Sequence, residues 1–233
     1  MGNPIAVVTG VGPGTGAAIV RRFAHGGYSV AMLARNRDRL IQLESEIANA
    51  HAYPCDVTNE AQIDSTIAAI RSRLGAPKVL IHNAVGGAFG NFLSIDPQVL
   101  NQNFQVNTMA LLYLARRLAP SMIDAGDGAI IASGNTSAIR GKANFAGFAP
   151  TKAAQRILAE SMARELGPKG VHVAYVLIDA VIDLAWTRKR WPEAPDGFFI
   201  KPAAIAEEIW HVAHQDRSAW CFNVEIRPFG ETW

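Results

Sequence analysis

Residues 5–24 read IAVVTGVGPGTGAAIVRRFA, and this stretch decides the fold. A short apolar, mostly β-branched run is followed by a glycine-rich turn and then by an amphipathic helical pattern. Glycines are needed in such a turn because a backbone that carries Cβ atoms cannot turn so tightly and still approach a pyrophosphate. The charge of the pyrophosphate would then lie on N–H groups of the helix. The stretch therefore predicts a strand, a phosphate-binding loop and a helix that together bind a dinucleotide.

Two glycine patterns fit this turn. Gly12, Gly14 and Ala17 fit the generic G-x-G-x-x-A fingerprint. Gly10, Gly14 and Gly16 fit Thr-Gly-x-x-x-Gly-x-Gly, which we favour because Gly10 falls directly after the strand. The candidate cofactor-binding residues of the turn are Thr9, Gly10, Gly14, Thr15 and Gly16.

Short β-rich runs alternate with helical patterns along the whole chain, which is typical of βαβ units and of a parallel sheet covered on both faces. The expected strands span residues 5–9, 29–34, 50–55, 79–83, 128–133, 171–178 and 220–226. No repeat, low-complexity tract or linker marks a second domain. We therefore predict one α/β domain over residues 1–233, a Rossmann-type doubly wound parallel sheet of seven strands with helices on both faces.

The sequence DLAWTRKRWPEAPDGFFIKP, residues 183–202, is the one long stretch without a clear pattern. Irregular segments of this length in a compact domain are usually functional. We interpret it as a substrate lid, and the alternative is a short helix that the pattern does not show.

Composition narrows the class of protein. With 49% hydrophobic and 18% charged residues among 233, the chain is typical of a globular protein. A formal charge of +2, with Lys and Arg dispersed, argues against nucleic-acid or anionic-membrane partners, and no apolar run reaches the ~18 residues of a spanning helix. Only two cysteines and no signal peptide before the first strand favour a cytoplasmic protein. We expect its substrate to be a small molecule.

The end of the second expected strand indicates which cofactor is used. An NAD-binding protein would carry an acid there for the ribose 2′-hydroxyl. The stretch VAMLARNRDRL, residues 30–40, offers Ala34 and Arg35 instead. Because a guanidinium binds a phosphate bidentately, Arg35 favours NADP, while NAD stays possible. The alternative for Arg35, Arg37 and Arg39 is a solvated loop and helix start.

Taken together, these motifs resemble those of the short-chain dehydrogenase/reductase family over essentially the whole chain. CDVTNE at residues 55–60 is similar to the family's adenine-contacting Asp-Val, and IHNAVGG at 81–87 resembles its Asn-Asn-Ala-Gly segment. The resemblance implies that Asp56, Val57 and Asn83 are further cofactor-binding residues.

FQVNTMA at residues 104–110 places Asn107 at the family's catalytic asparagine, and Lys152 matches its lysine. The resemblance implies that the Lys binds the nicotinamide ribose and lowers the pKa of a Tyr four residues earlier, which exchanges a proton with the substrate oxygen. It also implies that a Ser about thirteen residues before the Tyr polarises that oxygen, and that the Asn holds a water of the proton relay.

The sequence departs from this pattern at two positions, so it resembles a divergent branch of the family. Phe148 stands where the Tyr is expected, and Asn135 stands at the Ser position. Alternatives for the Ser position are Ser133, Thr136 and Ser137. The candidate catalytic residues are Asn107, Asn135 and Lys152, of which Lys152 is also a cofactor-binding candidate.

Hydride transfer is the chemistry of the cofactor, so the departures remove only a positioned acid, typically worth ~10²–10⁴ in rate. We expect an NADP(H)-dependent oxidoreductase that acts on a small carbonyl, alcohol or activated double bond with a nonstandard proton donor. Candidate donors are Lys152 acting through water, Asp179 and Asp183, whereas a conjugated enone would need only an oxyanion donor such as Asn135. The alternative is a non-catalytic NADP-binding sensor or scaffold that retains the fold.

Each of these residues also has a structural alternative. Asn107 would be a helix kink or a core amide with satisfied hydrogen bonds, and Lys152 would only hold the ribose. Asp179 and Asp183 would be turn or cap residues, and His82 a packed core histidine.

The resemblance also implies a homodimer or homotetramer. Aromatic side chains of the last strand and tail would suit such an interface: Trp220, Phe222, Phe229 and Trp233.

Overall fold

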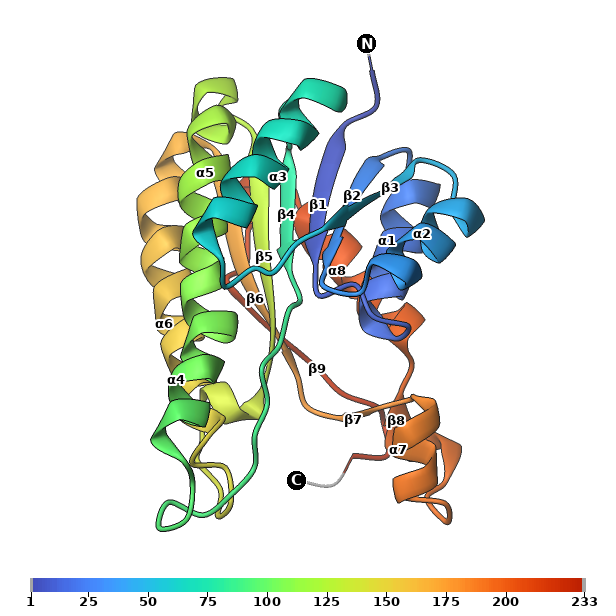
Figure 1. Cartoon of the computed structure of the whole chain (residues 1–233), viewed down its shortest axis with the longest axis vertical. Helices are drawn as coiled ribbons and strands as arrows, with labels where there is room; N and C mark the ends of the chain where they lie inside the picture. Colours follow the sequence, from blue (N-terminus) through green and yellow to red (C-terminus); the bar gives the residue numbers. More distant parts are fainter. Residues whose placement is uncertain (1, 232–233) are drawn as a thin grey trace.

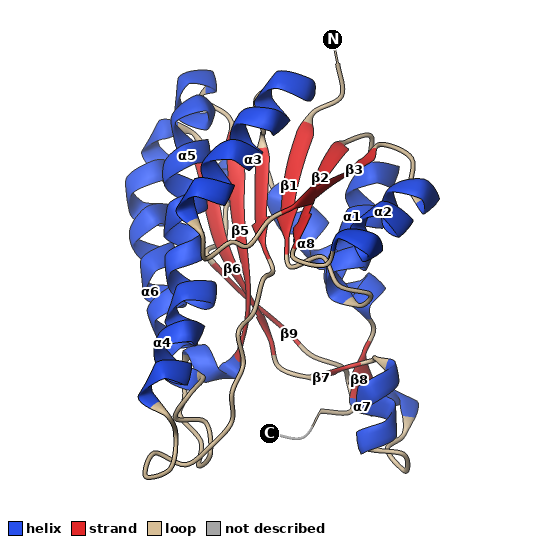
Figure 2. Ribbon diagram, viewed as in Figure 1, coloured by secondary structure: helices blue, strands red, loops and turns tan. Residues whose placement is uncertain are grey.

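The computed structural model describes residues 2–231 and is built around a parallel sheet with helices on both faces (Figures 1 and 2). The seven strands lie in the order β3-β2-β1-β4-β5-β6-β9, and each neighbouring pair is parallel. Their bounds are β1 (Ile5–Thr9), β2 (Ser29–Ala34), β3 (Ala50–Pro54), β4 (Val79–His82), β5 (Gly128–Asn135), β6 (Val171–Ile178) and β9 (Asn223–Ile226). The predicted α/β fold class is confirmed.

Four of the predicted strand boundaries are wrong. β3 ends at Pro54 and β4 ends at His82, each one residue earlier than predicted. β5 continues to Asn135, which pairs with Ile178 of β6. β9 begins at Asn223 and not at Trp220, because the Trp220 ring stacks on His172 with centroids 4.8 Å apart. Trp233, which we expected at an interface, lies outside the described residues.

The helices connect these strands across both faces of the sheet. They are α1 (Thr15–His25), α2 (Arg37–Glu46), α3 (Glu60–Arg73), α4 (Pro97–Phe104), α5 (Ala110–Ala125), α6 (Ala149–Leu166), α7 (Ala185–Arg190) and α8 (Pro202–Ala213). A π-helical turn (Gln105–Met109) joins α4 to α5. Local chemistry starts several of them: the side chains of Asn36, Asn59 and Asp96 accept backbone N–H groups at the beginnings of α2, α3 and α4.

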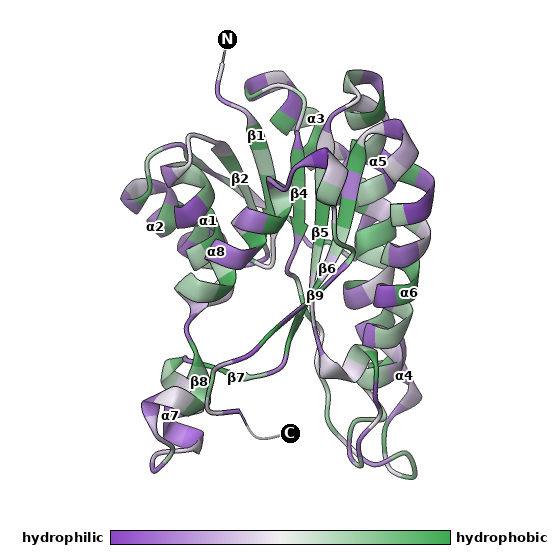
Figure 3. Cartoon of the chain, turned by 180° about the vertical axis from the view of Figure 1, so that it is seen from behind, coloured by the Kyte–Doolittle hydropathy of each residue, from purple (hydrophilic) through white to green (hydrophobic). Residues whose placement is uncertain are grey.

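Each face of the sheet has its own hydrophobic core. One lies between the sheet and α3, α5 and α6, and the other lies between the sheet and α1, α2 and α8. Val7 belongs to the first core and Val8 to the second, because alternate side chains of a strand point to opposite faces. The central strands are accordingly hydrophobic throughout (Figure 3). Within the described part of the chain, no helix is both long and apolar enough to cross a membrane.

The strand order changes direction between β1 and β4, and this topology places the site. Connections from β1 and β4 run to opposite sides of this point, which leaves a crevice at the carboxyl ends of the strands. The residues predicted to bind the cofactor follow these strand ends.

Residues 181–200 form an arm that stands off the carboxyl end of the sheet (Figure 1). The arm contains β7 (Val181–Ile182), α7 and β8 (Phe199–Ile200), with β7 and β8 paired in parallel. Arg188 stabilises it by pairing with Asp183 and Asp196 and by lying 4.0 Å from the centre of the Phe199 ring. The short-helix alternative for this segment is therefore correct, and the expectation of a wholly irregular loop is wrong.

Candidate functional site

The loop between β1 and α1 has a backbone that only glycine fits. Gly10 has a φ of +67°, and a Cβ on it would lie 2.5 Å from the backbone of Ala84. A Cβ on Gly16 would lie 2.5 Å from the Gly10 carbonyl oxygen. Among residues 2–231, no side chain hydrogen-bonds the N-terminus of α1, and no acidic residue lies in its first turn. The unpaired N–H groups at this helix end suit an anion.

A cavity of about 880 Å³ lies beside this loop. Four predicted cofactor residues line it: Gly10, Arg35, Asp56 and Val57. The Asp56 carboxylate is fixed by bonds from the backbone N–H and the hydroxyl of Thr58, at 3.0 and 2.8 Å. Arg35 is exposed at the end of β2 and makes no ion pair among residues 2–231. The cavity is therefore lined both by the glycine-rich loop and by the guanidinium of Arg35.

Other predicted cofactor residues lie behind the loop in a hydrogen-bonded network. Thr9 Oγ1 accepts the Asn83 N–H at 3.2 Å, and Asn83 Nδ2 donates to the Gly10 carbonyl at 3.0 Å. Asn83 Oδ1 accepts the hydroxyl of Ser133 at 3.1 Å. Thr9 and Asn83 thus shape the loop from inside.

The three remaining turn residues lie at or beside the start of α1. Thr15 is buried there, and Gly16 packs against the Gly10 carbonyl. Gly14 does not line the cavity, because its Cα faces the side chain of Leu184 from the arm. The arm therefore touches the glycine-rich loop.

His82 is a packed core histidine in the structure. It is fully buried, with Nδ1 3.1 Å from Thr9 Oγ1 and Nε2 3.2 Å from the Val106 carbonyl. Burial, with a smaller contribution from the nearby charge of Lys152, lowers its pKa to about 3. A ring that is neutral at physiological pH fits both bonds when Nε2 donates and Nδ1 accepts.

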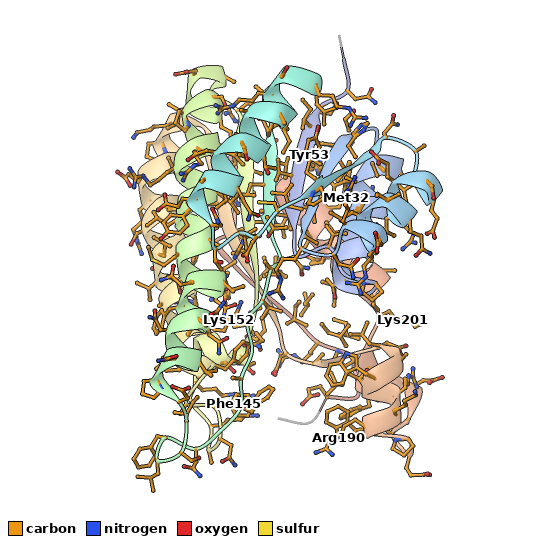
Figure 4. The ribbon with its side chains drawn as sticks, viewed as in Figure 1. Met32, Tyr53, Phe145, Lys152, Arg190 and Lys201 are labelled. Carbon is orange, nitrogen blue, oxygen red and sulfur yellow. The ribbon has the colours of Figure 1, made fainter. Side chains whose placement is uncertain are left out.

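Lys152 lies on the buried face of α6, with 2% of its surface exposed. Its Nζ donates to the Ser133 carbonyl at 3.0 Å and to Oε1 of Gln155. Figure 4 shows Lys152 and Phe145 on one side of the crevice, and Arg190 of α7 on the other. Burial lowers the pKa of Lys152 to about 7, because the charged form loses its hydration. The ammonium, held at the end of β5, thus releases its proton more readily than that of an ordinary lysine.

Asn107 lies within the π-helical turn, and its side chain is satisfied inside the protein. Oδ1 accepts the Gly86 N–H at 2.9 Å, while Nδ2 donates to the Gly86 carbonyl and to Thr151 Oγ1, both at 2.8 Å. Its backbone carbonyl accepts Nε2 of Gln155 at 2.6 Å. The side chain of Asn107 is therefore the core amide with satisfied hydrogen bonds that we gave as the alternative. Its backbone carbonyl is the group that is linked to Lys152, through Gln155.

Phe148 is 5% exposed and lies at the start of α6 in an aromatic cluster. Its ring centroid is 6.0 Å from that of Phe89, and Phe89 meets Phe145 edge-on at 5.0 Å. The position four residues before Lys152 thus contributes an apolar surface.

Asn135 is the last residue of β5, and only the oxygen of its side-chain amide is hydrogen-bonded. Oδ1 accepts the Ser137 N–H at 3.1 Å, and Nδ2 has no acceptor within the described chain. Of the alternatives for this position, Ser133 donates its hydroxyl to Asn83 and Ser137 is buried. The hydroxyls of Thr136 and Ser137 make no hydrogen bond within the described chain either, so Asn135 is one of three candidates with an unused donor.

The two aspartates proposed as proton donors form ion pairs and not the turn or cap contacts that we expected. Asp183 is held by two bonds from Arg188, at 2.7 and 2.9 Å, which lower the pKa of its carboxyl. Asp179 lies 3.6 Å from an Arg140 nitrogen. The Asp183 carboxylate, whose charged form the guanidinium stabilises, is therefore a poor proton donor.

Two residues of the site, Gln155 and Leu184, are not predicted from the sequence. Gln155 carried a detectable signal, because it is a polar residue on the same helical face as the buried Ala159 and Met162. Leu184 carried none, since its contact with Gly14 spans distant parts of the chain.

Residues 4–188 match a family model described as short chain dehydrogenase. An uncharacterized oxidoreductase of Staphylococcus aureus (strain N315) is 26% identical over 228 residues, which cover 97% of each chain. The 7alpha-hydroxysteroid dehydrogenase of Escherichia coli (strain K12) is 29% identical over 192 residues, which cover 81% of this chain and 75% of the relative.

Solved structures are similar over nearly the full length. A short-chain dehydrogenase from Rhodopseudomonas palustris is 31% identical with a TM-score of 0.82, and the match covers 97% of this chain and 98% of that one. A metagenomic short-chain oxidoreductase in complex with NADP is 29% identical with a TM-score of 0.85 and 98% coverage of both chains.

Proposed function

Because the chain belongs to the short chain dehydrogenase family, we propose that it is an NADP(H)-dependent oxidoreductase acting on a small carbonyl, alcohol or activated double bond, with a proton donor other than tyrosine. The predicted enzyme class, a nicotinamide-dependent dehydrogenase or reductase, is confirmed by this membership. The observation that supports the rest of the proposal is the buried Lys152 ammonium, which is bonded to Ser133 near the end of β5. Asn135 ends the same strand, and its Nδ2 has no acceptor among the described residues.

The residues around the cavity fit NADP. Gly10 and Gly16 let the loop pack against Ala84 and onto itself, and Gly10 lines the cavity in which a pyrophosphate would lie. The first turn of α1 carries no acidic residue that would repel its charge. Arg35 supports a 2′-phosphate, because β2 ends in Ala34 and offers no carboxylate to a ribose hydroxyl. The metagenomic relative in complex with NADP supports the same choice. When bound, the cofactor supplies or accepts a hydride at its nicotinamide ring.

Lys152 is the proton donor in this proposal. When a carbonyl carbon gains a hydride, the C=O π bond breaks and its electron pair stays on oxygen. The Lys152 ammonium gives one proton to that oxygen through a water, which leaves an alcohol and a neutral amine, and the amine regains its proton from solvent. A pKa of about 7 suits an acid that works near neutral pH.

Asn135 and the aromatic cluster set what the site accepts. Asn135 Nδ2 donates a hydrogen bond to the substrate oxygen as negative charge develops there, but an amide does not transfer a proton. Phe89, Phe145 and Phe148 give the substrate an apolar wall. A conjugated enone fits this arrangement as well, since its oxygen needs only an oxyanion donor while water protonates carbon.

The arm acts as a lid in this proposal. Leu184 lies on Gly14 of the glycine-rich loop, so the arm reaches the phosphate-binding region. Trp186 and Trp191 on the arm are 64% and 39% exposed, which leaves apolar surface for a substrate to cover.

We also propose a homodimer or homotetramer. Exposed apolar side chains such as Ile157 on α6 and Phe229 support a contact between copies. Sedimentation of the purified protein as a monomer would contradict it.

The test is a screen of purified protein with NADPH over small carbonyls and conjugated enones, with wild type compared to Lys152→Met. We expect turnover above background that the substitution abolishes, together with tighter binding of NADPH than of NADH. Tight NADPH binding without turnover of any substrate would contradict the catalytic proposal and favour the sensor or scaffold alternative.

A further inference from the structure

A buried glutamine joins Lys152 to the backbone of Asn107. Gln155 lies three residues after Lys152 on α6 and is fully buried. Its Oε1 accepts a hydrogen bond from Lys152 Nζ, and its Nε2 donates to the Asn107 carbonyl at 2.6 Å. An ammonium only donates and a carbonyl only accepts, so the reversed amide would lose both bonds. The chemistry of the two partners therefore fixes the orientation of the amide.

We propose that Gln155 is a positioning residue that anchors the Lys152 ammonium and closes the inner side of this ammonium to water. The anchoring is independent of any reaction, whereas its meaning for proton transfer rests on the proposed function. An ammonium has three donors, and two of them are taken by the Ser133 carbonyl and by Gln155. The third donor has no acceptor among residues 2–231, and we assign the proton exchange of Lys152 to it.

The packing behind Gln155 supports this closure. The hydroxyl of Tyr175 on β6 donates to Gln155 Oε1 at 3.4 Å, so both acceptor positions of that oxygen are used. Tyr175 is fully buried, and it reaches this position because Gly134 of β5 has no Cβ, which would collide with the phenol. Gly134, Tyr175 and Gln155 thus form one packed unit around the Gln155 amide.

The titratable groups near Lys152 are both uncharged at neutral pH, so Gln155 is the partner through which its pKa can be changed. They are His82 on β4 and Tyr175 on β6, and burial keeps both neutral by lowering the pKa of His82 and raising that of Tyr175. No carboxylate pairs with Lys152 among the described residues of α6, the π-helical turn or these strands. A change at position 155 should therefore change the proton affinity of the amine directly.

The test measures the pKa of Lys152 in cofactor-free protein by NMR titration of ¹³C-labelled lysine, with the signal assigned by Lys152→Met. Gln155→Glu places a carboxylate on the ammonium and should raise this pKa by at least about one unit. Gln155→Leu removes an acceptor of the charged form and should lower it. The control is Ser161→Ala at an exposed position on the same helix, which should leave the Lys152 pKa unchanged. Thermal unfolding of each variant checks that it folds.

An unchanged Lys152 pKa in both variants would overturn the proposal. If Gln155→Leu does not fold, the nearly isosteric Gln155→Glu decides alone. Where wild type turns over a substrate, the pH at half-maximal rate should move with the measured pKa in Gln155→Glu, which a merely structural role would not produce. Failure to find any turnover would count against the proposed function, while the NMR titration would still decide the role of Gln155.

Discussion

The rings of Phe148 and Phe89 lie with their centroids 6.0 Å apart, and this contact buries the residue four positions before Lys152. Phe148 is the N-cap residue of α6, and Lys152 lies on the buried face of this helix. Ser133 and Gln155 accept two of the three Lys152 donors, so these bonds do not depend on a phenol. We propose that the site uses this amine and the apolar aromatic cluster in place of a phenol.

Restoring a phenol tests whether the rest of the site supports carbonyl reduction. Phe148→Tyr should raise the rate of NADPH-dependent carbonyl reduction, by up to ~10²-fold, because it adds a positioned acid next to a lysine. Steady-state kinetics on the best carbonyl of the screen measures this. The matched control is Phe145→Tyr in the same aromatic cluster, which should give no gain. An equal gain from both variants would show that the position of the hydroxyl does not matter.

Arg35 should discriminate between the two nicotinamide cofactors. Arg35→Ala removes a charge-assisted contact with the 2′-phosphate and should weaken NADPH binding roughly 10-fold to 100-fold while leaving NADH binding unchanged. Fluorescence titration of both cofactors measures this. Arg37→Ala serves as the control, since Arg37 is exposed and does not line the cavity. Equal weakening of NADH binding would contradict the role of Arg35.

The lowered pKa of Lys152 predicts how stability depends on pH. Its folded pKa is about 7, and its ordinary value is 10.5, so between these values the unfolded chain binds more protons than the folded one. Stability should therefore rise with pH across this window, by about 2 kcal/mol between pH 7 and 9 from this group alone. Urea unfolding of wild type and Lys152→Met at both pH values isolates the contribution. A pH dependence that is the same in the variant would contradict it.

The fold could be predicted from sequence because its signals are local. The glycine-rich turn after β1 and the alternation of strand and helix patterns specify a parallel sheet without any knowledge of contacts. The six residues of α7 escaped prediction because so short a helix shows no periodicity. β9 was extended too far because Trp220 looks like a strand residue but stacks on His172.

The site was harder to predict because its hydrogen bonds join distant positions. Asn107 was identified by its motif, but only the structure shows that Gly86 and Thr151 occupy its side chain. Gln155 reaches a carbonyl 48 positions away. Sequence patterns show that such a residue is buried and polar, and they do not show its partner.

Gly134 and Tyr175 should be energetically coupled. A Cβ at Gly134 would collide with the phenol of Tyr175, so Gly134→Ala should destabilise the protein by roughly 1–3 kcal/mol. In a Tyr175→Val background the collision is absent, and the same substitution should cost little. Urea unfolding of the four proteins of this double-mutant cycle measures the coupling, and Gly141→Ala, where a Cβ meets nothing within 4 Å, is the control. Equal costs of Gly134→Ala in both backgrounds would show that the phenol does not depend on the missing Cβ.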